Sequence, residues 1–171
     1  MPNAEVALAL RKMTRAWLET QVGGSDALEA MLSALLRGDG PVVERHLSRM
    51  VKVNLSCFDT AGPEPERFYH GLVVGLLAGL GSAYEVRSNR ESGFGRCDVM
   101  VLPRAARQPG VVMELKRVDP DAGETPEKAI AAALAQIQER DYAAELRERG
   151  AAPIWTMAAV FDGKRAYVRV A

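Results

Sequence analysis

Apolar residues in the first part of the chain recur at the three- and four-residue spacing of amphipathic helices. Residues 3–20 fit one helix and residues 40–52 fit another. Between them we expect a helix that is capped by Ser25 and ended by Gly38. These helices carry no evident chemistry, so helix packing is their expected purpose.

The pattern changes after a turn-like segment at residues 59–63, which marks a candidate domain boundary. A strongly apolar helix is predicted first, and its opening turn is rich in charged residues. Three strands, a long helix and two further strands complete the chain. The predicted ranges, in order, are 65–80, 84–88, 97–102, 111–116, 125–149, 154–161 and 165–170.

Local signals support the boundaries of the later elements. Thr125 is a plausible N-cap for the long helix because Pro126 follows it at the first helical position, and Gly150 stands after the helix. Asp162 and Gly163 form a hairpin signal between the last two strands. The pattern therefore predicts an α/β domain with the order helix, three strands, helix, two strands.

Charged residues interrupt two of these apolar strands. Asp98 lies in the strand 97–102, and Glu114 and Lys116 lie in the strand 111–116. Side chains alternate along a strand, so Glu114 and Lys116 point to the same face. Burial of charge is costly unless the charge is paired or bound to a metal. We therefore expect a site with a divalent metal at this place.

The loop between the two strands predicts how these charges meet. In an antiparallel hairpin centred on residues 103–110, Asp98 falls nearly opposite Glu114 and Leu115. Two carboxylates that lie so close repel each other unless a cation lies between them. Asp98, Glu114 and the backbone carbonyl of Leu115 could form part of a shell for Mg²⁺ or Mn²⁺, with water completing it. Lys116 could then orient a water or stabilise a phosphate.

Composition limits the class of protein. The 22 basic and 22 acidic residues give a net charge of zero, which argues against a large positive surface for nucleic acid. Residues 84–117 have a net charge of +3, which is a weak local signal. No apolar run is long enough to span a membrane. The two cysteines, without metal-ligand spacing, favour a reducing cytoplasm over a disulfide or a zinc site.

Several segments in the correct order resemble the PD-(D/E)XK nuclease superfamily, which includes restriction-endonuclease-like folds. The resemblance is greatest to the C-terminal nuclease-like domain of bacterial AAA-ATPase-like proteins, and it covers about residue 54 to the C-terminus. The matching segments are Phe58-Asp59-Thr60, residues 66–71, residues 88–98, Glu114-Leu115-Lys116, Ala135-Gln136-Ile137 and Tyr142.

The resemblance implies a restriction-endonuclease-like three-layer core, αβββαβ, with a mixed sheet flanked by helices. It implies metal ligation by Asp98 and Glu114, and Lys116 as the catalytic lysine. Glu66 would be an additional acid that acts through a water, and Gln136 an accessory polar residue. Residues 1–55 would be a helical connector to an absent ATPase-like domain, and residues 56–171 the nuclease-like domain.

The function we expect is hydrolysis of nucleic acid, with DNA as the favoured substrate. Glu91, Arg96, His70 and Tyr142 are further candidates for contact with it. An AAA-type ATPase and a second copy of the chain, docked through the first helices, are the expected protein partners. The alternative is a non-catalytic module that binds nucleic acid or serves an ATPase.

Structural alternatives stand beside each of these roles. Glu114 and Lys116 could form an ion pair within the strand, and Glu66 could serve only the helix dipole. Gln136 could lie on the helix surface, and Glu91 and Arg96 could form a salt bridge in a loop. His70 and Tyr142 could pack in the interior, as could Phe94. Cys97 is expected to be a buried, inert thiol.

Overall fold

The computed structural model describes residues 16, 19–20, 23–54, 65–92, 95–119 and 121–171. Helices α2 (Ser25–Arg37), α3 (Gly40–Asn54) and α4 (Pro65–Leu77) come first, and the 3₁₀ helix η1 (Ala78–Ala83) follows. The remaining elements are the strands β1 (Tyr84–Ser92), β2 (Gly95–Pro103) and β3 (Gly110–Arg117), the helices α5 (Pro126–Glu139) and α6 (Ala144–Glu148), and the strands β4 (Ile154–Asp162) and β5 (Arg165–Val170).

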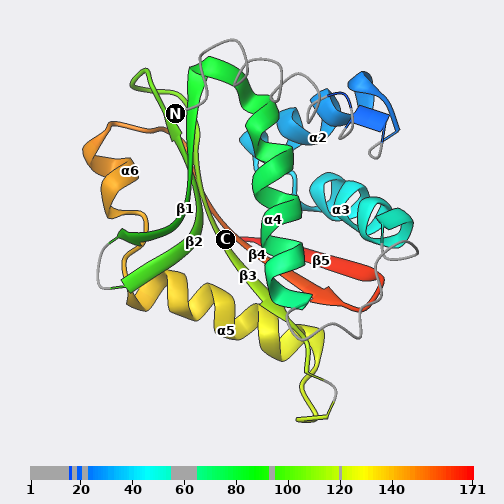
Figure 1. Cartoon of the computed structure of the whole chain (residues 1–171). Coiled ribbons are helices and arrows are strands. Elements are labelled where there is room, and N and C mark those ends of the chain that lie inside the picture. The colour runs from blue at the N-terminus through cyan, green and yellow to red at the C-terminus, as the bar shows by residue number, and fades with distance from the viewer. Residues whose placement is uncertain (1–15, 17–18, 21–22, 55–64, 93–94, 120) are drawn as a thin grey trace, which may run out of the picture.

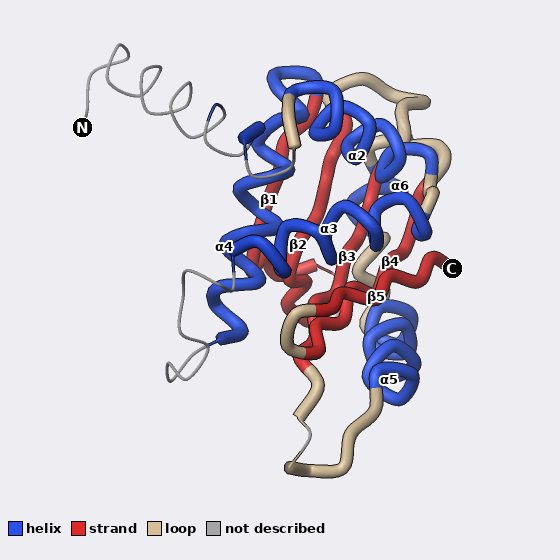
Figure 2. Tube along the Cα trace, turned by 90° about the vertical axis from the view of Figure 1, so that its right-hand side faces the viewer, coloured by secondary structure: helices blue, strands red, loops and turns tan. Residues whose placement is uncertain are grey.

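The five strands form one mixed sheet in the order β1-β2-β3-β4-β5. Neighbouring strands are antiparallel except β3 and β4, which are parallel and are joined by the crossover through α5 and α6. Figure 1 shows α2, α3 and α4 on one side of the sheet and α5 and α6 on the other. Figure 2, turned by 90°, shows the sheet face on, with α3 drawn across the strands. The predicted three-layer α/β architecture with a mixed sheet is therefore confirmed.

Strand β3 lies at the centre of the sheet and is covered on both faces. Val111, Met113 and Leu115 pack into the core that contains α2, α3 and α4. Val112 packs on the other face, against α5 and α6. Two-sided cover explains why the segment is an almost continuous apolar run. It also means that a charged side chain in this strand enters a protein interior on either face.

Helix α3 covers the outer edge of β5 through side-chain hydrogen bonds. The Ser48 hydroxyl donates to the Ala166 carbonyl at 2.9 Å and accepts from the Ala166 N–H at 3.1 Å. The Glu44 carboxylate accepts from the Val168 N–H at 2.8 Å. An edge strand exposes unpaired backbone groups that must be covered or blocked. The N-terminal helices thus share a core with the sheet and also cover its edge.

Three sequence expectations about the helices need correction. The predicted long helix over 125–149 is two helices, because Asp141 takes a left-handed conformation with φ 50° and turns the chain so that Tyr142 enters the core. Gly24, rather than Ser25, is the N-cap of α2. The apolar helix ends as an α-helix at Leu77, and the 3₁₀ helix η1 follows.

Other boundary signals are confirmed. Gly38 ends α2 in the left-handed conformation, and the Thr125 hydroxyl accepts the Lys128 N–H as the N-cap of α5. The β4–β5 hairpin closes through a two-residue loop of Gly163 and Lys164, so the turn lies one residue beyond the expected pair.

Two expectations fall on residues outside the described ranges. Most of the predicted first helix, residues 3–20, lies there, and so does the predicted boundary between residues 55 and 56. No helix in the described ranges is long and apolar enough to cross a membrane.

Removal of the Ser48 hydroxyl tests the cover on the β5 edge. Ser48→Ala leaves the N–H and C=O of the buried Ala166 without this partner, so we expect the free energy of unfolding to fall by about 1–3 kcal/mol. Urea unfolding monitored by circular dichroism measures this change. Ser33→Ala, at an exposed serine of α2, is the matched control and should change stability by less than about 0.5 kcal/mol. Equal midpoints for both variants would contradict the assignment.

Candidate active site

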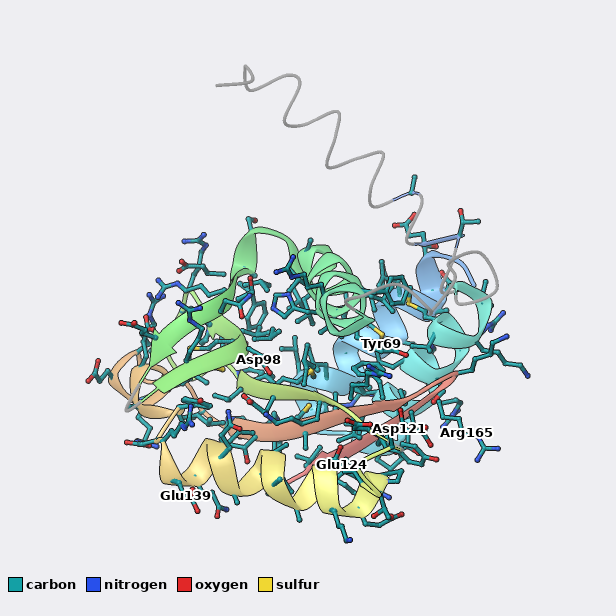
Figure 3. The ribbon with its side chains drawn as sticks, turned by 60° about the horizontal axis from the view of Figure 1, so that its bottom comes forward. Tyr69, Asp98, Asp121, Glu124, Glu139 and Arg165 are labelled. Carbon is teal, nitrogen blue, oxygen red and sulfur yellow. The ribbon has the colours of Figure 1, made fainter. Side chains whose placement is uncertain are left out.

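Asp98 and the Glu114–Leu115 segment lie where β2 and β3 separate. The described ladder joins Val101 to Val111 and Val99 to Met113, and the same register places Asp98 opposite Glu114. In Figure 1, β1 and β2 bend away from β3, and Figure 3 shows Asp98 on β2 beside the yellow-green ribbon of β3. The Leu115 N–H donates to Asp98 Oδ2 at 2.9 Å in place of a ladder partner. The predicted hairpin register is therefore confirmed.

The Glu114 carboxylate is buried on the α5 face of the sheet. The residue is 2% exposed and is the buried charged residue of the described core. Oε1 accepts from Lys116 Nζ at 3.2 Å and from Gln136 Nε2. Oε2 is buried and has no hydrogen-bond partner among the described residues. A buried carboxylate oxygen without a donor is costly, so the position calls for a ligand.

Burial raises the pKa of Glu114 above its ordinary value, and the negative charge of Asp98 raises it further. The Lys116 ammonium opposes this rise. The sum is still a raised pKa, so the ionised form of Glu114 is held at a cost in the metal-free protein. A cation bound beside Glu114 would stabilise its ionised form and offset the charge of the neighbouring Asp98.

Lys116 and Gln136 hold each other beside Glu114. Lys116 Nζ donates to Gln136 Oε1 at 3.0 Å as well as to Glu114. The Gln136 amide donates in turn to Glu114 Oε1 and to the Tyr142 hydroxyl, the latter at 3.2 Å. The structure thus brings together Glu114, Lys116 and Gln136, and Gln136 points into the protein rather than lying on the helix surface.

Tyr142 contacts this cluster through Gln136 and is itself fully buried. Its hydroxyl also accepts from Arg140 Nη1 at 3.3 Å. A Cβ atom on Gly95 would lie 2.7 Å from Arg140 Cδ and 3.2 Å from the Tyr142 hydroxyl, so glycine leaves the space for these side chains. The expectation that Tyr142 contacts nucleic acid is wrong for this structure, because the residue is not accessible, and the alternative that it packs in the interior is confirmed. Its contact with Gln136 makes it a positioning residue.

The donor set fits a divalent cation with oxygen ligands. In the described part of the chain no three His, Cys, Asp or Glu side chains form a metal-binding group. The described residues offer two carboxylates, those of Asp98 and Glu114, and the Leu115 carbonyl. The N–H and C=O of a strand residue project to the same edge, so the Leu115 carbonyl faces the side on which Asp98 accepts the Leu115 N–H. The orphaned Glu114 Oε2 completes the set. Mg²⁺ suits such a site because it keeps several waters.

The remaining candidates are distributed around this site. Glu66 lies in the first turn of α4, and its side chain is outside the described part of the structure. Glu91 and Arg96 are exposed and stand opposite each other in the β1–β2 ladder. Cys97 is buried, and burial raises its thiol pKa to about 12, so the expectation of an inert thiol is confirmed.

A cavity of about 300 Å³ opens on the opposite, α4-facing side of Asp98. Its described lining consists of Arg67, His70, Asn89, Asp98 and Leu115. His70 was expected near the substrate, whereas Arg67 and Asn89 were not singled out from the sequence. The one sequence signal for Asn89 is its residue type, because asparagine tolerates a positive φ within a strand.

The raised pKa of Glu114 predicts a pH dependence of stability. A carboxyl group whose pKa is raised in the folded state stabilises the fold below the ordinary carboxyl pKa, and this contribution is lost as pH rises through the raised value. In metal-free buffer, wild type should therefore lose stability with rising pH relative to Glu114→Gln. Urea unfolding of both proteins at several pH values between acid and neutral measures the difference. A difference that stays constant with pH would contradict the raised pKa.

A comparison with protein-family models found a match, whereas a comparison with curated proteins found none. A family model described as the PD-(D/E)XK nuclease superfamily matches residues 64–170, more than half of the 171 residues and all five strands. Members of this superfamily are generally nucleases and typically use divalent metals. The chain belongs to the PD-(D/E)XK nuclease superfamily.

Proposed function

We propose that this protein is a metal-dependent nuclease that hydrolyses phosphodiester bonds of DNA by attack of an activated water. The observation that carries the proposal is the buried Glu114 Oε2, which has no partner among the described residues and lies in a strand next to Asp98. A purely structural ion pair with Lys116 satisfies Glu114 Oε1 but leaves Oε2 buried without a hydrogen-bond partner among the described residues. The orphaned oxygen and the Asp98 carboxylate together support a cation site.

Asp98, Glu114 and the Leu115 carbonyl would hold the ion, which we propose to be Mg²⁺ or Mn²⁺. A bound divalent cation would supply acidification of a water and neutralisation of the charge that develops on the phosphate. The protein keeps Asp98 oriented through the Leu115 N–H. It keeps Glu114 oriented through Gln136, which Tyr142 fixes in turn. Both carboxylates are thus held in place before a substrate arrives.

Lys116 is proposed as the catalytic residue that acts on the substrate phosphate or on the attacking water. Its side chain is 32% exposed, so Nζ can reach a substrate, whereas Glu114 is enclosed. The bond to Gln136 Oε1 directs the ammonium along the same face of β3 as Glu114. In this position Nζ would orient the attacking water or stabilise the extra negative charge on the phosphate. Glu66, in the first turn of α4, is proposed as a further acid that acts through a water.

A second candidate is a non-catalytic module that binds nucleic acid or a partner protein. The zero net charge favours it. The net charge of +3 in residues 84–117 also overstates the positive charge available to nucleic acid. Arg87 is neutralised by ion pairs with Glu85 at 2.6 Å and with Glu145 at 2.5 Å. The orphaned Glu114 oxygen favours the enzyme, and we rank catalysis first for that reason. An ATPase partner, a homodimer and a cytoplasmic location stay predictions.

Cleavage of DNA is the direct test. In Mg²⁺ or Mn²⁺, wild type should cleave plasmid or linear DNA, and Lys116→Ala should lower the rate by about 10²-fold or more because it removes charge stabilisation of the transition state. Lys128→Ala, at an exposed lysine on α5, is the matched control and should retain the wild-type rate. Purification of all three proteins by one protocol excludes a contaminating enzyme. Equal rates for wild type and Lys116→Ala would contradict the proposal.

Metal titration separates the enzyme from the non-catalytic module. Isothermal titration of metal-free protein with Mn²⁺ should show binding by wild type and a loss of that heat in Asp98→Asn, which removes one negative ligand. Bound metal should also raise the melting temperature of wild type, because it stabilises the folded state by mass action. Asp121→Asn, at an exposed acid in the loop after β3, is the control and should bind as wild type does. No heat with wild type at millimolar metal would favour the module.

A further inference from the structure

The cavity of about 300 Å³ on the α4 side of Asp98 is not explained by the catalytic cluster, which lies on the α5 side. Its walls differ in chemistry. Arg67, His70 and Asn89 have nitrogen-bearing side chains, and Asp98 and Leu115 also belong to the proposed cation site. Its volume is at the small end of the range for ligand pockets, and suits one small polar group better than a duplex.

The backbone of β1 is strained at this cavity. Asn89 has φ 50° in the middle of the strand, whereas its neighbours Ser88 and Arg90 keep ordinary pairs with Val99 and Cys97. A left-handed residue inside a strand costs free energy and persists where the surroundings impose it, often at functional sites. The distortion directs the Asn89 amide to within 3.5 Å of His70 Nε2, at the cavity wall.

The His70 imidazole is only loosely engaged. Nε2 lies 3.3 Å from the Asp98 carbonyl oxygen and 3.5 Å from Asn89 Nδ2. Both distances exceed the usual range for a hydrogen bond to nitrogen. The imidazole and the amide can therefore turn to a ligand in the cavity at small cost. Arg67, one helical turn before His70 on α4, lines the same cavity.

We propose that this cavity binds a backbone phosphate of the nucleic-acid strand, next to the phosphate that is cleaved. The inference rests on the proposed nuclease function and extends it to the path of the substrate. Arginine and asparagine side chains are common donors to nucleic-acid phosphates. Asp98 joins the two sites, because its carboxylate faces Leu115 and its carbonyl faces His70. A phosphate held here would place the adjoining phosphodiester at the Asp98–Glu114 edge of the sheet.

The experiment measures binding without cleavage and then cleavage separately. Fluorescence anisotropy of a short labelled single-stranded DNA in EDTA gives the Kd of wild type, Arg67→Gln, His70→Ala and Asn89→Gly over a range of salt concentrations. Asn89→Gly keeps the left-handed backbone and removes only the amide, because glycine adopts positive φ freely. His46→Ala, at the other histidine of the chain, is the matched control on α3.

We expect Arg67→Gln to weaken binding about tenfold and to lower the slope of log K against log salt by about one, as loss of a phosphate contact does. His70→Ala and Asn89→Gly should each weaken binding about fivefold, and His46→Ala should leave it unchanged. In Mg²⁺ the three cavity variants should raise KM more than they lower kcat.

Two outcomes separate this inference from the proposed function. Wild-type affinity and salt slope in all three cavity variants, with cleavage that still depends on Lys116, would overturn the phosphate site and leave the nuclease standing. Weakened binding in the cavity variants, with no cleavage by wild type under any metal, would support the site and overturn the catalytic proposal. Thermal melting of each variant confirms that it is folded before it is compared.

Discussion

The buried carboxylate of Glu114 is the constraint on which the rest of the site depends. It stands on a central strand that is covered on both faces, so its charge has no direct access to water. One oxygen is satisfied by Lys116 and Gln136, and the other has no partner among the described residues. A protein tolerates this cost when function repays it. This requirement also restricts the position of α5, because Gln136 on that helix donates to Glu114 Oε1.

The break between α5 and α6 belongs to the same constraint. A continuous helix over 125–149 would carry residue 142 on past Gln136 along the helix axis. The left-handed turn at Asp141 instead returns Tyr142 into the core, where its hydroxyl meets the Gln136 amide. Gly95 on β2 leaves the space that Arg140 and Tyr142 occupy. The glycine before Asp98, the helix break and the glutamine are therefore parts of one support for Glu114.

Most of the architecture could be predicted from the sequence, because hydrophobic periodicity and turn residues act locally. The strands, the hairpin register that sets Asp98 opposite Glu114, and the shared face of Glu114 and Lys116 all follow from alternation along a strand. The break at Asp141 could not be predicted, because residues 125–149 have helical periodicity and the burial of Tyr142 is a tertiary effect. The cavity could not be predicted for the same reason: Arg67 and His70 on α4 are distant in sequence from Asn89, and they meet it only through the packing of α4 on the sheet.

The two faces of β3 have different roles in a protein whose net charge is zero. On the α5 face Glu114 is enclosed, and its low exposure strengthens its interaction with the partly exposed Lys116. The α4 face is open at the cavity, where Arg67, His70 and Asn89 present donors. Asp98 is common to both, since its charge raises the pKa of Glu114 on one side and its carbonyl contacts His70 on the other. With the proposed phosphate site, a protein of zero net charge would bind an anionic strand locally, because the donors are gathered at one point of the sheet rather than spread over the surface.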